Sequence, residues 1–170
     1  LLMPSADSLM ALAIFIDAHA VCGDAALLEQ VRDSLFGLVN DNDALLARFA
    51  AAITAFDSGQ GWWSRLFTLD DGKERLDLKK AGTFPLVHGV RALALADRVA
   101  ATGTAERVAA LVAAGRLPAP MGQELVEALH VFMRLKLDAG LAARAAGGRG
   151  DAVDPARLGT LDRELLHDAL

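Results

Sequence analysis

Asp17 is the residue whose surroundings most restrict its chemistry, because it is the single formal charge between Ser8 and Gly23. An ionised carboxylate among apolar side chains is costly unless a cation or hydrogen-bond donors reach it. We therefore expect a basic partner from the second part of the chain. The candidates are Lys79, Lys80, Arg91, Arg134 and Lys136. Two interpretations remain open: a structural salt bridge between two halves of the chain, or a small cationic site in a groove between them that takes a phosphate or a carboxylate.

Two Glu-x-x-His motifs suggest a metal site as a less favoured alternative. They are Glu127 with His130 and Glu164 with His167. This spacing places a carboxylate and an imidazole on one helix face, as di-iron bundles require of two of their four helices. However, the second motif lies in the last turns of the chain, where ends fray, and Arg134 would oppose a dication beside His130. We interpret both motifs as solvated helix faces.

His19 and Cys22 could supply two ligands near a helix end, but no second pair completes a tetrahedral set. Cys22 is more simply interpreted as a buried small hydrophobe. The Gly-x-Gly pairs that begin at Gly59 and Gly148 do not follow a buried strand, which a phosphate-binding loop requires. The sequence thus offers no nucleotide cradle and no zinc site.

Bulk composition excludes further classes of function. The 17 basic and 22 acidic residues give a net charge of -5, which argues against a nucleic-acid-binding face. No run approaches the ~18 apolar residues of a membrane span, and no signal sequence is present. One cysteine fits a reducing compartment. We expect a soluble cytoplasmic protein without nucleic-acid or membrane partners.

Helical spacing of apolar residues dominates the 170 residues, so the fold class is predicted to be all-α, a bundle of about seven helices. We expect a single helical domain, 1–170, with a first helical half at 1–57, an irregular connector at 58–82 that could hold a short hairpin, and a second helical half at 83–170. Asp24, Pro85 and Thr104 are expected at helix starts, with the helix from Pro85 running to about Ala100. A long helix should begin near Pro120, and a final one at Thr160.

The apolar pattern also predicts which helix faces are buried. The helix at 8–23 is apolar on most sides, so it should be largely buried. Apolar residues at helical spacing likewise predict the inward faces of the second helix and of the long helix. They are Leu28, Val31, Leu35 and Leu38 on the second helix, and Leu125, Leu129, Phe132 and Met133 on the long one.

Several short motifs occur in an order that resembles a known family. They are Leu76-Asp77-Leu78-Lys79-Lys80, Pro85-Leu86-Val87, the run from Arg91 to Ala96, Val153-Asp154-Pro155, and the leucines from Leu158 to Leu170, preceded by the stretch from Ala13 to Asp24. Together they resemble the family known as the putative nucleotidyltransferase substrate-binding domain, over nearly the whole chain. Asp17, Asp77, Lys79 and Arg91 match the family pattern, and the resemblance implies that they bind substrate. The chain departs from the pattern at His19, His88 and Gly140.

The resemblance also implies a molecular context. Such domains form the helical portion of bacterial signal-transduction proteins in which CBS or cyclic-nucleotide-binding modules precede a nucleotidyltransferase akin to the PII-protein uridylyltransferases. Because the chain opens on Leu1 without an initiator methionine, we expect it to be part of a longer chain with these modules upstream. Mg²⁺ and a nucleoside triphosphate are expected on the absent catalytic module, with no cofactor on this chain.

The catalytic signature itself is missing from these residues. Nucleotidyl transfer of this type needs a Gly-Ser turn followed by paired aspartates that hold Mg²⁺, and the nearest imitation, Asp41-Asn42-Asp43, is a capping turn between helices. We therefore expect a non-catalytic accessory domain that binds an acceptor protein or small molecule. The alternative is a structural or regulatory interaction domain that relays sensor signals, and a homodimer is compatible with either.

Overall fold

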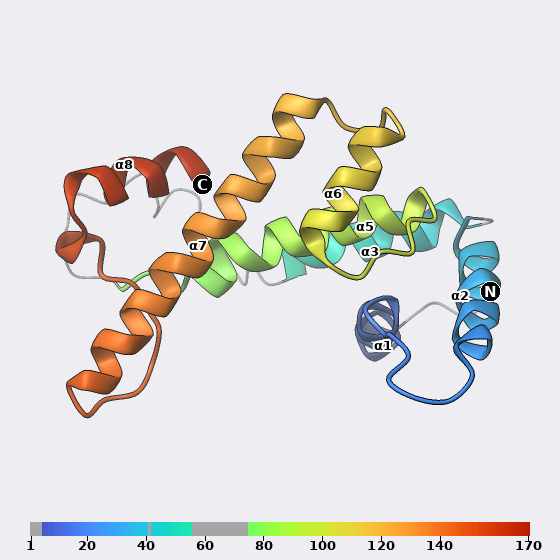
Figure 1. Cartoon of the computed structure of the whole chain (residues 1–170), viewed down its shortest axis with the longest axis horizontal. Helices are drawn as coiled ribbons and strands as arrows, with labels where there is room; N and C mark the ends of the chain where they lie inside the picture. The colour runs from blue at the N-terminus through green and yellow to red at the C-terminus, as the bar shows by residue number, and fades with distance from the viewer. Residues whose placement is uncertain (1–4, 41, 56–74) are drawn as a thin grey trace. The chain divides into compact units, whose positions relative to one another are not determined.

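The computed structural model describes residues 5–40, 42–55 and 75–170, and within them the fold is all-α, as predicted (Figure 1). The seven α-helices in these ranges are α1 Ala6–Ile16, α2 Ala25–Asn40, α3 Asp43–Ala55, α5 Phe84–Ala96, α6 Thr104–Ala113, α7 Ala119–Ala145 and α8 Thr160–Ala169. A π-helix, Lys79–Thr83, precedes α5, and a 3₁₀ turn, Pro155–Arg157, precedes α8. In the described ranges, extended pairing is limited to one antiparallel bridge between Leu76 and Val153.

The chain divides into two compact units. The first unit combines Leu1–Ala52 with Val87–Gly122, and the second combines Ile53–Leu86 with Gln123–Leu170. Each unit thus takes residues from both halves expected from the sequence, and the single domain of 1–170 stays a prediction. Most of the expected connector, including the possible hairpin, lies outside the described residues, while its end contains Leu76 and the start of the π-helix.

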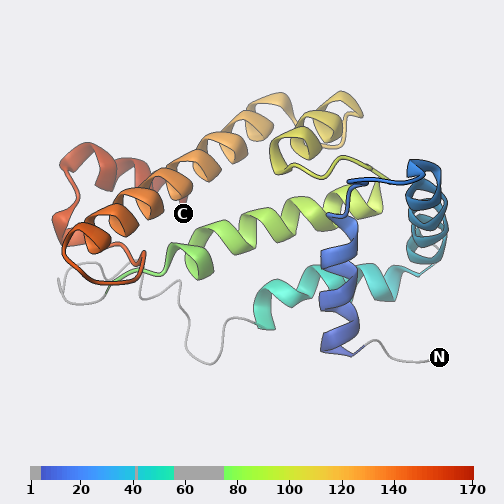
Figure 2. The same cartoon turned by 60° about the horizontal axis from the view of Figure 1, so that its bottom comes forward.

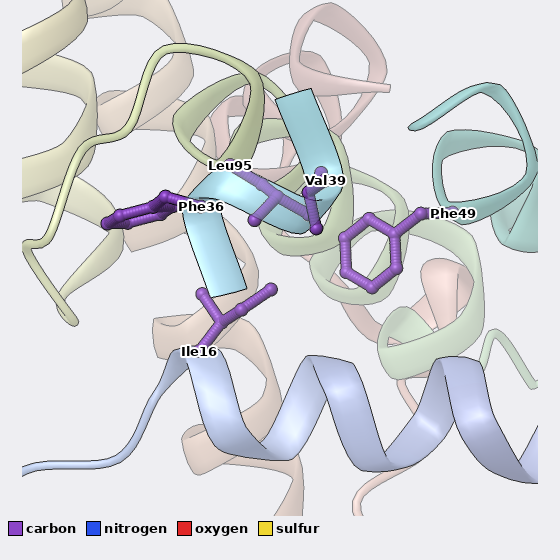
Figure 3. Packing of buried hydrophobic residues seen from close by; sticks show 5 residues of the cluster. All are labelled: Ile16, Phe36, Val39, Phe49 and Leu95. Atoms are coloured by element: carbon purple, nitrogen blue, oxygen red, sulfur yellow. The ribbon is translucent and has the colours of Figure 1, made fainter. Parts of the chain in front are cut away.

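The core of the first unit gathers one or two apolar side chains from each of four helices (Figure 3). They are Ile16 of α1, Phe36 and Val39 of α2, Phe49 of α3 and Leu95 of α5. The inward stripe predicted for α2 is wrong at Val31 and Leu38, which are exposed, whereas Leu35 packs against this core. Apolar residues occur on more than one side of α2, and tertiary packing selects the side with Phe36 and Val39.

α1 is shorter and more exposed than its sequence suggests. It begins where the Ser5 hydroxyl accepts a hydrogen bond from the Ser8 amide, and it ends at Ile16 rather than Gly23. The amide of Asp17 bonds to the carbonyl of Ile14, an i to i-3 bond that tightens the final turn. Large side chains of α1 such as Ile14 remain exposed, so the prediction that this helix is largely buried is wrong.

The core of the second unit lies where the C-terminal end of α8 meets the middle of α7 (Figure 1). Its buried members are Leu78, Phe132, Leu135, Val153 and Leu166. Leu129 and Phe132 are buried as predicted, but Met133 is exposed. The predicted starts of α7 and α8 are confirmed to within one residue.

The π-helix leads directly into α5. Pro85, the second residue of α5, has no amide hydrogen and cannot bond to the carbonyl four residues earlier, so it suits a first turn. In the turn before it, the amide of Phe84 reaches back five residues to the carbonyl of Lys79. α5 ends at Ala96, four residues earlier than expected, and α6 begins at Thr104 with Gly103, not Thr104, as its N-cap.

Candidate functional site

The end of α1 carries a charge cluster formed by Asp17, Arg91 and Arg107, all in the first unit. Arg91 of α5 contacts the Asp17 carboxylate through two nitrogens: Nη2 pairs with Oδ2, and Nε lies 3.3 Å from Oδ1. Arg107 of α6 approaches from another helix, with its Nη1 2.8 Å from the same Oδ1. Two cations and one anion leave the charge cluster with a net positive charge.

Arg107 is the most deeply buried member, with a side chain only 1% exposed. Its Nε donates to the carbonyl of Ala101 at 2.7 Å, and its Nη2 donates to the carbonyl of Ile16 at 3.1 Å. Each guanidinium nitrogen therefore has an acceptor, which a buried cation requires. Arg107 fastens the end of α1 to α6.

A third arginine, Arg32, bonds to the backbone just after the end of α1. Arg32 of α2 is buried, and its Nη2 donates to the carbonyl of Ala18 at 2.8 Å while its Nη1 pairs with Glu29 at 2.6 Å. The last carbonyls of a helix lack intrahelical donors and form the negative end of its dipole. Arg107 supplies such a donor to the carbonyl of Ile16, while Arg32 binds the carbonyl of Ala18, two residues beyond the last residue of α1. The positive charge of Arg107 offsets the cost of placing Asp17 at this end.

The pKa of Asp17 reflects the competition between burial and its two arginines. Burial raises the pKa of the carboxyl, whereas hydrogen bonds from Arg91 and Arg107 and attraction to their charges lower it further than burial raises it. The net result is a pKa below the usual aspartate value, so Asp17 is ionised near neutral pH.

His88 lies on α5 one turn before Arg91 and is buried against α3. Its Nε2 donates to the carbonyl of Phe49 at 2.6 Å, and its ring lies 4.6 Å from the Phe49 ring. Burial lowers the pKa of His88, the bond to Phe49 raises it, and the nearby Arg91 charge lowers it, with a net decrease. His88 is therefore neutral at pH 7.

Asp77 and Lys79 belong to the second unit, at the start of the π-helix. The Asp77 Oδ1 accepts from the amides of Lys79 at 3.0 Å and Lys80 at 3.4 Å, so its carboxylate works as a helix cap. Leu78 between them is buried, and the side chains of Lys79 and Lys80 are exposed. Within the described ranges no ion pair involves Lys79.

The structure therefore brings together some of the four residues predicted to bind substrate. Asp17 and Arg91 form an ion pair in the first unit, and Asp77 and Lys79 are neighbours in the second. Convergence of all four, and their contact with substrate, stay predictions. Arg107 was missed as a partner of Asp17; the signal was a basic residue beside Val108 and one turn before Leu111 on the buried face of α6.

The other proposed partners of Asp17 pair elsewhere in the second unit. Arg134 contacts Asp162 at 2.7 Å, and Lys136 contacts Asp151 at 3.1 Å. Both lie on α7, one pairing with α8 and the other with the loop before it. Arg134 and Lys136 are therefore each paired with an aspartate of the second unit.

The alternative metal ligands form no cluster of three in the described part of the chain. Glu127 instead accepts a hydrogen bond from Gln123 at 2.8 Å, and His130 and His167 are exposed. Cys22 is exposed, so its predicted burial is wrong, because α1 ends before the segment that carries it. Among the described helices, none has the length and apolar character needed to cross a membrane.

Comparison with known families agrees with the resemblance seen in the motifs. The family model described as "Putative nucleotidyltransferase substrate binding domain" matches residues 43–170, from the start of α3 to the C-terminal residue. No curated protein and no solved structure shows significant similarity to the chain. The match includes Asp77, Lys79 and Arg91 and leaves Asp17 outside. Since it covers most of the sequence, the chain belongs to the nucleotidyltransferase substrate-binding domain family.

Proposed function

We propose that this domain binds the acceptor substrate for a nucleotidyltransferase module and does not itself catalyse transfer. The observation that carries the proposal is the family match over residues 43–170. The sequence adds that these residues contain no Gly-Ser turn followed by Asp-x-Asp. In this proposal Mg²⁺ and the nucleoside triphosphate belong to the catalytic module, where the metal offsets charge in the transition state.

The four residues that match the family pattern divide into two roles in this proposal. Asp17 and Arg91 are engaged with each other and with Arg107, and Asp77 caps the π-helix. In this proposal Asp17, Arg91 and Asp77 hold the local backbone in position. Lys79 is exposed and pairs with no carboxylate of the described residues, so it is the residue of the set best able to contact an anionic group of the acceptor or nucleotide.

The test is a transfer assay on the full-length protein that contains this domain, with nucleoside triphosphates labelled at the α-phosphate and fractionated cell extract as the acceptor source. Lys79→Ala should raise the half-saturating acceptor concentration roughly five- to tenfold, the loss expected for one charge-assisted contact. Arg149→Ala, which removes one exposed charge from a loop of the same unit, is the matched control and should leave it unchanged. Equal behaviour of the two variants would contradict the assignment of Lys79.

The second candidate is an interaction domain that relays signals from CBS or cyclic-nucleotide-binding modules of a bacterial cytoplasmic protein. Exposed apolar side chains on α1 and α2, including Ile14 and Leu38, favour it. This candidate predicts that Lys79→Ala leaves transfer unchanged while Ile14→Ser alters the response to the sensor ligand. Arg91→Ala does not discriminate, since the ion pair with Asp17 makes it destabilising in either case.

A further inference from the structure

α7 presents an exposed apolar stripe formed by Met133, Leu137 and Leu141. These residues are 55%, 61% and 58% exposed, and they repeat every fourth residue on one side of the helix. The opposite side of the same helix carries Phe132 and Leu135, which are buried in the core of the second unit. α7 therefore has two apolar sides, of which one is already packed (orange helix in Figures 1 and 2).

The dimensions of the α7 stripe suit one helix. From Met133 to Leu141 the helix rises about 12 Å, or roughly two turns. Residues four apart form a ridge of the kind that packs between the side chains of a neighbouring helix. An amphipathic helix is accordingly the occupant that this surface fits best.

The charges along α7 indicate which amphipathic helix is complementary to the α7 stripe. Before the α7 stripe, the nearest exposed charged residue is Glu127, and after it comes Arg144; Asp138, beside Leu137, is exposed and lies 3.9 Å from Arg134. Arg134, at the edge of the stripe, is already paired with Asp162 at 2.7 Å, so its charge is compensated within the unit. α7 is thus acidic before the α7 stripe and basic after it, and an antiparallel copy of α7 is complementary to it.

We propose that the α7 stripe binds the same stripe of a second copy of this chain in antiparallel orientation. With the twofold axis at Leu137, each Met133 lies opposite Leu141 of the other copy, because both are four residues from the centre. The ends then bring Arg144 of each copy opposite the exposed His130 of the other, with Glu127 of that copy about one turn further along. Every contact occurs twice, as an isologous interface requires.

The proposed interface is small. Two helical turns bury less than the roughly 1,200–2,000 Å² of a stable interface, so this contact alone gives a weak, reversible dimer. The experiment therefore uses the whole 170-residue chain over a concentration series from low micromolar to submillimolar, followed by sedimentation equilibrium. The native chain should shift from monomer to dimer across this range.

Single substitutions test the centre and the ends separately. Leu137→Glu should weaken association at least tenfold, whereas Leu93→Glu, at an exposed leucine of α5, should not. Arg144→Glu should also weaken it, and adding Glu127→Arg to the same chain should restore it. Circular dichroism checks that each variant keeps the native helix content.

Cysteine cross-linking tests the orientation in a Cys22→Ser background, which removes the single native cysteine. At an interhelical distance of 8–10 Å, facing Cα atoms are about 4–6 Å apart, within reach of a disulfide. Leu137→Cys should cross-link to itself. Met133→Cys should not, but it should cross-link when mixed with Leu141→Cys.

Each result of these experiments either supports the proposed dimer or contradicts it. Concentration-dependent dimers that need Leu137 and cross-link from position 133 to 141 support the proposal. A chain that is monomeric throughout, a dimer indifferent to Leu137→Glu, or self-cross-linking of Met133→Cys, the mark of a parallel pair, overturns it.

Discussion

Arg107 and Asp17 are the residues on which the packing at the end of α1 depends most. Replacing Asp17 with Asn would leave the buried Arg107 without its counter-charge. Losing one partner of a fully buried pair costs about 3–5 kcal/mol, and because the Asp17 carboxylate is 37% exposed we expect about 2 kcal/mol. Urea denaturation measures this loss in the free energy of unfolding.

The matched control is Asp97→Asn, which breaks the ion pair between Asp97 and the exposed Arg116 in the same unit. Asp97 is 18% exposed, but its partner Arg116 is 61% exposed and can be solvated, so this pair should contribute about 0–1 kcal/mol. Equal losses from the two substitutions would show that burial of Arg107 does not set the energy of the charge cluster.

His88 makes the first unit sensitive to acid. Its pKa is lowered in the folded state, so the neutral form stabilises the fold above the unfolded-state pKa near 6.5, and this contribution is lost as pH falls towards the folded-state pKa. The free energy of unfolding should therefore decrease between about pH 6.5 and pH 5. Asp17, whose pKa lies below the usual aspartate value, adds a further loss only at lower pH.

Urea titrations at several pH values isolate the histidine. His88→Gln keeps a donor for the Phe49 carbonyl but cannot titrate, so the decrease between pH 6.5 and 5 should become shallower. His130→Gln, at an exposed position of α7, should keep the native slope. An unchanged slope in His88→Gln would mean that other groups carry the acid sensitivity.

At the scale of single elements, the π-helix depends on Gly82. A Cβ atom at this position would lie 2.7 Å from the ring of Phe132, a side chain that is itself buried. Since Phe132 has little room to move, Gly82→Ala should destabilise the chain by about 1–3 kcal/mol. Thermal unfolding followed by circular dichroism measures the change.

Gly37→Ala provides the comparison within a helix. Nothing lies within 4 Å of a Cβ atom at Gly37 of α2, so the substitution should stabilise by about 0.5–1 kcal/mol through the better helix propensity of alanine. Opposite signs for the two glycines are the expected result. A stabilising effect at Gly82 would mean that the close approach to Phe132 is wrong.

Helix positions were largely predictable from the sequence, but buried faces were less so. Pro85 and the cap at Asp24, whose Oδ1 accepts from the Ala26 amide at 2.9 Å, act locally and could be identified from residue type. The buried face of α2 was missed because apolar residues on several sides give equivalent periodicity. Only packing against other helices selects Phe36 and Val39.

In the candidate site, too, features set by neighbouring residues could be predicted, whereas contacts between residues far apart in the sequence could not. That Asp17 needs a cation follows from its apolar surroundings, and Arg91 was among the candidates. Arg107 lies 90 residues further along the chain, and its bond to the Ile16 carbonyl depends on α1 ending at Ile16. This end was placed seven residues too late, so the carbonyls that Arg32 and Arg107 bind could not be identified.

At the scale of the whole molecule, family membership and the absence of the catalytic signature lead to one expectation about activity. The 170-residue chain alone should transfer no label from any of the four nucleoside triphosphates, because these residues lack the paired aspartates that hold Mg²⁺. A time course with labelled triphosphate and cell extract measures this. Transfer at rates above those of a heat-denatured sample would show a catalytic centre within the chain.

The most direct test of an acceptor-binding role compares nucleotidyl transfer by the proposed longer protein, which would join this domain to a nucleotidyltransferase module, and by a version that lacks these 170 residues. The account predicts that removal raises the half-saturating acceptor concentration at least about tenfold, a loss of about 1.4 kcal/mol of binding, while that of the nucleoside triphosphate stays the same. An unchanged acceptor dependence in the shortened protein would contradict it.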